Sequence, residues 1–486
     1  STLQSCVLSD SITRERIIFA IKGEMIIMLI KPSFNKSAQD ILLDRYLWKD
    51  DNGAVKETPE QMLLRIAQHV SSAEKTTPLQ YKWADEYYEI MAKLLFLPNS
   101  PTIMNAGRPA PHGQLAACFV IGIEDSMESI CEAIRKQMLI HKSGGGTGFN
   151  FSNLRGCGAK VNSTNGRASG PISFMSLFDK ATETVQQGGM RRGANMGILN
   201  VDHDDIREFI HCKDQDGTIS NFNISVGIFD DFMEKAQANP DGEEAALLYD
   251  IAESAWRSGD PGIIFLDAIN RGNTTPDLGP LTSTNPCGES PLYANEACNL
   301  GSINLSKMVK DGKFDFELLK DVTAVATRFL DSVIDVNHYP LPEIGEAVTL
   351  TRKIGLGVMG WADLLFQLLI PYDSDEALDL ADQIMSTIQE TSHSVSVALG
   401  KEKGIPASLE HLGRRNATLT CIAPTGTIAL LADCSSGIEP LFALEHSRVR
   451  TQIDGTKVVM KQANRYYEKA MKNNLSEDII NSVFIT

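Results

Sequence analysis

The stretch Ser283–Leu292, STNPCGESPL, contains one cysteine, Cys287. Its residue types predict a tight loop around that cysteine. Pro and Gly flank Cys287 and favour a turn, which indicates a reactive thiol rather than a packing residue. Asn285 and Glu289 stand two positions to either side, and in an extended tip residues i−2, i and i+2 project to one side. An amide, a sulfur and a carboxylate would then face one ligand, which suits a sugar with two hydroxyls. The alternative is a surface turn with a spare thiol.

Two further cysteines could supply a dithiol beside this sulfur. Cys298 follows Cys287 by eleven residues, and Cys118 opens an apolar run that is predicted to be a strand. Each alone is more typical of a buried core cysteine. A disulfide between them requires their Cα atoms to approach within about 7 Å, a demand that the sequence by itself does not test.

Three glycine-containing motifs have competing interpretations. Ala423–Leu430, APTGTIAL, is either a phosphate cradle of amides and hydroxyls or an ordinary capped helix start. Gly144–Gly148, GGGTG, indicates unusual backbone angles or close approach of a ligand or strand, and it lacks the lysine of a P-loop. Gly355–Gly360 matches the dinucleotide fingerprint, but Leu350–Lys353 before it is a poor strand, so a nicotinamide dehydrogenase is a distant alternative.

Composition narrows the class of protein. The 486 residues carry 43% apolar and 22% charged side chains, which is ordinary for a globular chain of two or three domains or one large barrel. A net charge of −17 argues against a nucleic-acid surface, although a local cradle can still hold a free nucleotide. The nine histidines show no metal spacing and there is no CxxC pair, so we expect no bound metal.

The cysteine count indicates the compartment. Nine cysteines, an odd number spread through a long chain, do not resemble a secreted disulfide framework. The apolar run Met25–Ile30 is too short to cross a bilayer, and the start lacks the layout of a signal peptide. We therefore expect a cytoplasmic protein without a membrane segment.

Apolar periodicity predicts the order of elements. Residues 38–96 show helical stripes at spacings of three and four, and short β-prone runs then alternate with helices. This alternation predicts an α/β fold with a largely parallel sheet, open or closed into a barrel. The expected strands are 118–123, 149–151, 197–200, 222–226, 262–266, 355–359 and 418–423. The expected later helices are 126–141, 173–187, 203–212, 243–257 and 316–334.

Taken together, the motifs resemble the large catalytic chain of ribonucleotide reductases, most closely the adenosylcobalamin-dependent class. The likeness extends from about Ser37 to about Lys461. The stretches that carry it are 115–120, 142–152 (KSGGGTGFNFS), 188–199 (GGMRRGANMGIL), 283–292, 296–304, 355–364 and 423–440 (APTGTIALLADCSSGIEP).

The resemblance implies a ten-stranded α/β barrel of two antiparallel halves, each of five parallel strands, with a central finger loop. It divides the chain into a helical N-terminal region (1–96), the barrel (97–450) and a C-terminal helical tail (451–486). The family activity is reduction of ribonucleotides, expected here to be diphosphates, to 2′-deoxyribonucleotides.

The resemblance also assigns roles to residues. Cys287 would carry the thiyl radical that abstracts the 3′-hydrogen, Glu289 would act as base on the 3′-hydroxyl, and Asn285 would bind the sugar. Cys118 and Cys298 would supply the reducing equivalents and end as a disulfide. The residues expected to bind substrate are Ser100, Ala117, Thr425, Gly426 and Thr427.

An effector site and a homodimer are implied as well. Family members bind a deoxynucleoside triphosphate or ATP at a dimer interface, where it selects the base to be reduced. The residues expected to bind this effector are Asp125, Arg155, Gly189 and Arg191.

The radical source and the reductant are further expectations. The spacing between Cys287 and Cys298 favours adenosylcobalamin, and the alternatives are a class I subunit fed by a separate metal-containing subunit or an inactive nucleotide-binding subunit. Members of the family usually extend further and carry a C-terminal cysteine pair, whereas this chain ends at Thr486 without one. A second polypeptide would then supply the last part, or the chain would be a truncated or minimal enzyme that uses a free reductant. A thioredoxin-like protein or a small dithiol would be the reductant.

Overall fold

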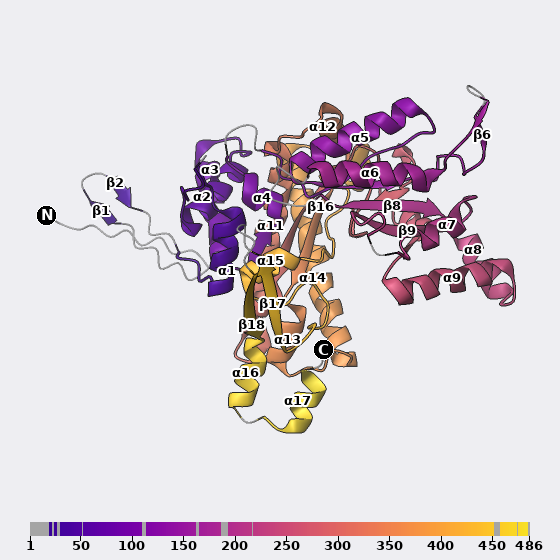
Figure 1. Cartoon of the computed structure of the whole chain (residues 1–486). Helices are drawn as coiled ribbons and strands as arrows, with labels where there is room; N and C mark the ends of the chain where they lie inside the picture. Colours follow the sequence, from indigo (N-terminus) through magenta and orange to yellow (C-terminus); the bar gives the residue numbers. More distant parts are fainter. Residues whose placement is uncertain are drawn as a thin grey trace.

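In the computed structural model, the fold is built around one central sheet (Figure 1). The structure describes residues 19–21, 24–26, 30–50, 52–108, 113–161, 165–185, 193–215, 217–451, 457–473 and 475–484. Within these residues eight strands form one sheet in the order β10-β9-β8-β5-β4-β13-β16, with β3 also paired to β13. Their bounds are β3 Phe96–Pro98, β4 Cys118–Val120, β5 Gly146–Asn150, β8 Asn195–Asn200, β9 Phe222–Ile228, β10 Gly262–Phe265, β13 Ala297–Asn304 and β16 Ile354–Met359.

The sheet consists of two halves, and the strands of one half run antiparallel to those of the other where the halves meet. Strands β4, β5, β8, β9 and β10 are parallel to one another. Strand β13 runs antiparallel to β4 and parallel to β16. The predicted α/β class and the antiparallel junction of two halves are therefore confirmed.

The sheet has eight strands within the described residues, against the ten that the resemblance implies for the whole barrel. Beyond β16 the expected strand 418–423 is reduced to a single parallel bridge between Leu356 and Thr420. Pro424 follows closely and has no N–H to extend the ladder, and the chain turns into a helix at Thr425. The second half is therefore shorter than the first.

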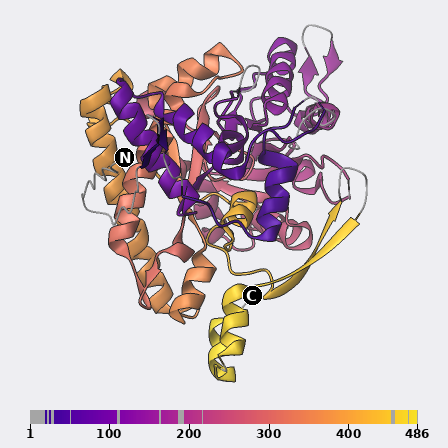
Figure 2. The same ribbon diagram turned by 90° about the vertical axis from the view of Figure 1, so that its left-hand side faces the viewer.

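Helices pack around the sheet, and the N-terminal helices lie together to one side of it (Figures 1 and 2). The N-terminal helices are α1 Lys36–Ile41, α2 Pro59–Ser71, α3 Thr77–Ala92 and α4 Ser100–Asn105, with a π-helix, η1, at Leu42–Tyr46. The helices of the first half are α5 Met127–Lys142, α6 Pro171–Val185, α7 Ile206–His211, α8 Asp230–Ala238, α9 Glu243–Ser258 and α10 Leu266–Arg271. Those of the second half are α11 Phe316–Val336, α12 Pro342–Thr351, α13 Trp361–Leu368, α14 Asp375–Lys403 and α15 Gly426–Ala432.

Local sequence explains where the N-terminal helices begin. At the start of α2, Thr58 and Gln61 form a reciprocal capping box and a proline occupies the first turn. The apolar stripe predicted from the sequence is the buried face of this helix, formed by Met62, Leu63, Ile66 and Val70. The same periodicity holds for α11, which buries most of its length between the sheet and α14.

A short hairpin carries the cysteine loop. Strands β11 (Ser283–Thr284) and β12 (Pro291–Leu292) pair antiparallel, and residues 285–290 form the tip. The hairpin packs closely on β5, since a Cβ added to Gly148 would lie 1.7 Å from the carbonyl oxygen of Thr284. The glycine run therefore serves close approach, one of the two interpretations made from sequence, and the neighbour is this finger hairpin.

The dinucleotide-like fingerprint has a packing role. It forms strand β16 and the start of α13, and a Cβ on Gly357 would lie 2.2 Å from the carbonyl oxygen of Cys421. The glycine is needed because the segment before α15 lies directly against the strand. This contact removes the dehydrogenase alternative as an explanation of the motif.

The expected helical tail from residue 451 also contains a strand. Strands β17 (Glu445–Thr451) and β18 (Lys457–Ala463) pair antiparallel, and α16 (Arg465–Lys472) and α17 (Glu477–Val483) follow. The sequence of β18 includes two adjacent valines, whose branched Cβ favours extended backbone. This C-terminal part projects from the main body (Figure 2) and is anchored by Phe484, whose ring centroid lies 4.6 Å from that of Phe366.

Several short elements complete the described chain. Two-stranded hairpins are formed by β1 Phe19–Ile21 with β2 Glu24–Ile26, β6 Lys160–Val161 with β7 Gly166–Arg167, and β14 Val309–Lys310 with β15 Lys313–Phe314. Short 3-10 turns lie at Pro276–Leu278, Leu305–Lys307 and Ala407–Leu412. Among the described residues no helix combines the length and apolar character needed to cross a membrane.

A buried histidine that packs against the first half of the sheet predicts that the protein loses stability at acid pH. His141 at the end of α5 is 3% exposed, and its Nε2 lies 3.0 Å from Thr147 Oγ1 of β5. Burial lowers the pKa of His141 from 6.5 to about 4, because the charged imidazolium loses its hydration. Between these two values the unfolded chain binds a proton that the folded chain does not, so stability falls as the pH drops from 6.5 to 4.

We expect this histidine to account for roughly 3 kcal/mol of the loss in unfolding free energy across that pH range. His141→Gln should therefore show a shallower decline, measured by urea unfolding at pH 7, 5.5 and 4.5. His393, whose ring is on the surface of α14, supplies the control variant His393→Gln. An unchanged slope in His141→Gln would contradict the assignment.

Candidate active site: a cysteine cavity beneath the finger hairpin

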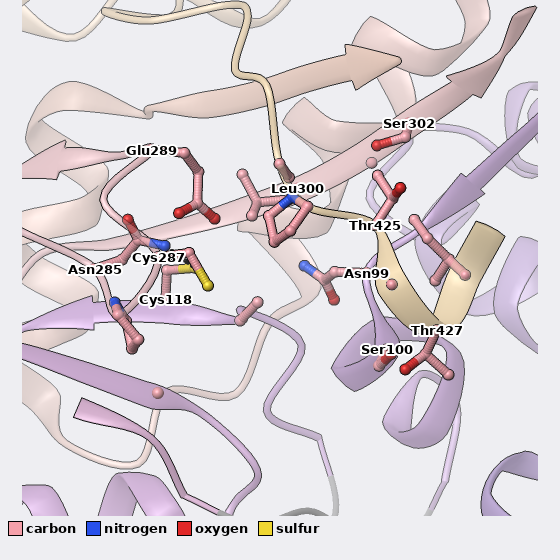
Figure 3. A pocket seen from close by; sticks show the side chains of 18 of the residues that line it. Asn99, Ser100, Cys118, Asn285, Cys287, Glu289, Leu300, Ser302, Thr425 and Thr427 are labelled. Atoms are coloured by element: carbon pink, nitrogen blue, oxygen red, sulfur yellow. Dashed lines mark hydrogen bonds between the residues drawn. The ribbon is translucent and has the colours of Figure 1, made fainter. Parts of the chain in front are cut away.

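A cavity of about 350 Å³ lies between the finger hairpin, the start of α4 and the start of α15. Figure 3 shows its two ends. The sulfur end carries Asn285, Cys287, Glu289 and Cys118, and the hydroxyl end carries Ser100, Thr425 and Thr427. Asn99 lies between the two ends.

The tip of the finger is shaped by Asn285. Its carbonyl oxygen accepts from the N–H of Gly288 at 3.0 Å, and its Oδ1 accepts from the N–H of Ser290 at 2.9 Å. Its Nδ2 donates to the sulfur of Cys118 at 3.1 Å. This one side chain therefore closes the turn and links it to the neighbouring strand. As a result Cys287 and Glu289 are both directed to the cavity.

Cys118 and Cys298 are brought directly opposite each other. They are paired residues of the antiparallel strands β4 and β13, both almost fully buried. Opposed residues of such a pair have Cα atoms roughly 4.5–5.5 Å apart, within the range that a disulfide spans. The geometric demand made from the sequence is therefore met. Cys118 lines the cavity and Cys298 lies behind it.

Burial controls the ionisation of both thiols. It raises the pKa of Cys118 well above its usual range, and the neighbouring charge of Glu289 acts in the same direction. Burial likewise raises the pKa of Cys298, with Cys421 as the next cause. Both groups are therefore protonated thiols at neutral pH, a state in which they can donate hydrogen atoms rather than act as free nucleophiles.

The hydroxyl end joins three segments that are distant in sequence. Ser100 starts α4, and its Oγ lies 2.7 Å from the hydroxyl of Tyr46 in η1. Thr425 precedes α15 with a φ of 50°, which is unusual for a β-branched residue, and its Oγ1 accepts from the N–H of Gly437 at 2.7 Å. All the residues predicted to bind substrate, Ser100, Ala117, Thr425, Gly426 and Thr427, line this cavity.

Sequence reasoning missed several residues of the site. Asn99 lines the cavity and caps α4, where its side chain accepts a hydrogen bond from the N–H of Thr102. Arg45, a cation at the cavity wall, had no recognisable motif. Cys421 packs with the buried pair, and its position two residues before the APTGT motif was the available signal.

The expected effector residues fall in two groups. Asp125 and Arg155 form an ion pair with a 2.7 Å contact at the surface. Arg155 also lines a second, more polar cavity of 400 Å³ at the ends of β5 and β8, together with residues such as Asp202 and His203. The other two expected residues, Gly189 and Arg191, lie outside the described residues.

Metal ligation has no candidate in the part of the chain that the structure describes, where no group of three or more His, Cys, Asp or Glu side chains could hold an ion. The polar groups that line the cavity are thiols, one carboxylate, amides, hydroxyls and the guanidinium of Arg45. The described residues thus form an α/β sheet of two opposed halves, in which a cysteine hairpin lies beside a cross-strand pair of cysteines.

Comparison with known families identifies this fold. The model for the ribonucleotide reductase barrel domain matches residues 116–245, 242–409 and 405–483, and the model for the all-alpha domain of the same family matches residues 32–111. These matches cover most of the chain, and the chain belongs to the ribonucleotide reductase large-chain family.

Individual relatives agree with the family. A vitamin B12-dependent ribonucleoside-diphosphate reductase from Thermoplasma acidophilum is 44% identical, over 88% of this chain and 66% of the relative. One with the same name from Mycobacterium tuberculosis is 45% identical, over 85% of this chain and 63% of the relative. The chain thus spans just under two thirds of the length of these relatives.

A solved structure supports the architecture. The alpha subunit of a class Id ribonucleotide reductase from Actinobacillus ureae superposes with a TM-score of 0.76 at 26% identity, over 93% of this chain and 81% of that one.

Proposed function

We propose that the chain reduces ribonucleoside diphosphates to 2′-deoxyribonucleoside diphosphates by thiyl-radical chemistry. The observation that carries this proposal is the opposition of Cys118 and Cys298 beside the cavity that Cys287 enters. One sulfur, that of Cys287, would then carry the radical, and the other two would reduce the same substrate. The two B12-dependent relatives act on diphosphates according to their names, which supports the same substrate here.

In this proposal each residue at the sulfur end has one role. The Cys287 thiyl takes the 3′-hydrogen of the ribose, and Glu289 accepts the proton of the 3′-hydroxyl while the 2′-hydroxyl leaves as water. Asn285 positions the sugar. Cys118 and Cys298 together give two hydrogen atoms and become a disulfide, and Cys287 recovers its radical when the 3′-hydrogen returns.

The hydroxyl end is proposed to hold the diphosphate. Ser100, Thr425 and Thr427 offer hydroxyl groups, and Arg45 offers a positive charge. Gly426 has no side chain, so the diphosphate can approach its backbone closely. Phosphate oxygens accept hydrogen bonds from all of these groups. The cavity volume of 350 Å³ lies within the usual range of small-molecule sites.

Adenosylcobalamin is the proposed radical source, as the names of the relatives suggest. The group would have to reach Cys287, and the exposed position of that residue is compatible with access from outside the hairpin. When bound, it supplies an organic radical that converts the Cys287 thiol into a thiyl.

The remaining proposals concern regulation and assembly. A deoxynucleoside triphosphate or ATP would bind near Asp125 and Arg155, whose ion pair would open to meet the ribose and phosphates. A homodimer would form around that site, and a thioredoxin-like protein or a small dithiol would reduce the disulfide. The odd number of cysteines supports a reducing cytoplasm.

A product assay tests the function. The protein is mixed with cytidine diphosphate, adenosylcobalamin and dithiothreitol, and deoxycytidine diphosphate is measured by chromatography. We expect product only when adenosylcobalamin is present, and at most one product per active site when dithiothreitol is omitted. A protein that binds the diphosphate but forms no product under any of these conditions would refute the proposal. Cytidine triphosphate in parallel reports the phosphate preference.

A further inference from the structure

Cys421 is a fourth sulfur at the site, and nothing in the proposed reaction uses it. It lies in the segment 418–421 that runs beside β16, where its N–H donates to the carbonyl oxygen of Leu356 at 3.1 Å. Its side chain packs in the same cluster as Cys118 and Cys298. The contacts between Cys421 and these two cysteines indicate whether it has a structural or a redox role.

Two contacts bring Cys421 next to Cys298. Gly355 of β16 stands between them, and a Cβ on this residue would lie 2.8 Å from Cys421 Cβ and 3.5 Å from Cys298 Sγ. Since glycine has no side chain, no side chain of β16 separates the two cysteines, and the neighbouring side chain there is that of Leu300, whose Cδ2 would lie 2.4 Å from the same added Cβ. Ser290 provides the second contact, because its Oγ lies 3.5 Å from Cys421 Sγ and also interacts with the thiol of Cys298.

The order of strands arranges the three sulfurs in a row. Strand β13, which carries Cys298, has β4 with Cys118 on one side and β16 on the other. Segment 418–421 follows on the far side of β16. Cys298 is therefore the central sulfur, with Cys118 and Cys421 on opposite sides. Thiol–disulfide exchange proceeds by attack of one sulfur on the central one while the third departs.

We propose that Cys421 is a third member of the redox cluster and receives the active-site disulfide from Cys118 by exchange at Cys298. The sulfur of Cys421, as thiolate, attacks Cys298 Sγ in the Cys118–Cys298 disulfide. A Cys298–Cys421 bond forms as the Cys118–Cys298 bond breaks. Cys118 leaves with the electron pair and takes up the proton that Cys421 released. No oxidant or reductant is consumed, and the starting disulfide is the product of the proposed reaction, on which this inference rests.

The exchange would move oxidation away from the substrate. Cys118 lines the cavity and recovers its thiol, whereas Cys421 is not fully buried and is more accessible to a dithiol than either member of the original pair. Burial raises the pKa of Cys421 to about 12, so its thiolate is scarce at neutral pH. The exchange should accordingly be followed over minutes to hours, the range of uncatalysed disulfide rearrangement.

Disulfide mapping tests the proposal. The reduced protein is given substrate and adenosylcobalamin without dithiothreitol, and samples are quenched with acid, alkylated with N-ethylmaleimide, digested and analysed by mass spectrometry. We expect Cys118–Cys298 first and Cys298–Cys421 later. Recovery of Cys421 only as the alkylated thiol, while Cys118–Cys298 persists at all times, would overturn the inference.

A second arm is independent of catalysis. Cys118→Ser is treated with the thiol oxidant diamide, which should join Cys298 to Cys421 in protein that circular dichroism shows to be folded. Cys118→Ser/Cys421→Ser should lower cross-linking of Cys298 at least tenfold, and Cys118→Ser/Cys434→Ser, altered at a half-buried cysteine of another cluster, should leave it unchanged. Failure of Cys298 and Cys421 to join in Cys118→Ser refutes the inference whether or not the protein makes product. Joining there without product in the assay would instead refute only the proposed function.

Discussion

Replacing Cys287 by serine is expected to abolish deoxynucleotide formation while nucleotide binding persists. A hydroxyl cannot take the place of the thiol, because the O–H bond is too strong to exchange a hydrogen atom with the organic radical. We expect the rate to fall by at least about 10⁴-fold, equivalent to roughly 5.4 kcal/mol of activation free energy. The measurement is product per enzyme in the adenosylcobalamin assay.

Folding should survive this substitution. Cys287 is at the tip of the hairpin and exposed, and Asn285 closes the turn without using the cysteine side chain. The affinity for cytidine diphosphate, measured by calorimetry, should change less than about threefold, or ~0.7 kcal/mol. Cys131→Ser on α5, another exposed cysteine outside the cavity, is the matched control and should keep full activity. A Cys287→Ser protein with more than a few per cent of the original rate would exclude the thiyl role.

Replacing Gly148 by alanine is expected to disable the site without changing any residue that lines it. The new Cβ would stand 1.7 Å from the carbonyl oxygen of Thr284 and 3.4 Å from Asn285 Cα, both backbone atoms of the finger. The hairpin must therefore move, since a backbone oxygen at its base cannot rotate away as a flexible side chain can. A displacement of about 1 Å at a reacting group costs on the order of 100-fold in rate.

Stability should fall as well, by about 1–3 kcal/mol, the usual cost of overpacking a well-packed site. Urea unfolding and the product assay measure the two effects. Gly272→Ala is the control, because its added Cβ would find no atom closer than 3.5 Å and the backbone there has a negative φ. Normal activity in Gly148→Ala would show that the finger does not depend on its contact with β5.

The local elements were largely predictable from the sequence. Helices such as α5 and α11 were expected close to their observed bounds, because each has an apolar stripe and a capping side chain, Ser126 and Asp315, at its start. Strands such as β8 and β9 were found within a few residues, for short β-prone runs leave little other choice. The C-terminal strand β18 was missed because its seven residues, KVVMKQA, do not alternate between apolar and polar side chains and so lack the period-two signal of a strand.

The candidate site was partly predictable for a different reason. Asn285, Cys287 and Glu289 are adjacent in the chain, so one turn brings them to one side. The expected binding residues Thr425, Gly426 and Thr427 form one peptide as well. Each such group needs only local backbone geometry, which neighbouring residues control.

Residue order along the chain determined the motifs: an Asn-x-Cys-x-Glu tip, a glycine run, an APTGT turn and the helical stripes. Only the tertiary structure decided that Cys118 faces Cys298, that Cys421 stands beyond Gly355, and that the glycine run makes room for the finger. The physical reason is strand register. A shift of one residue between β4 and β13 would turn one sulfur to the opposite face of the sheet, and that pairing depends on packing among segments far apart in the chain.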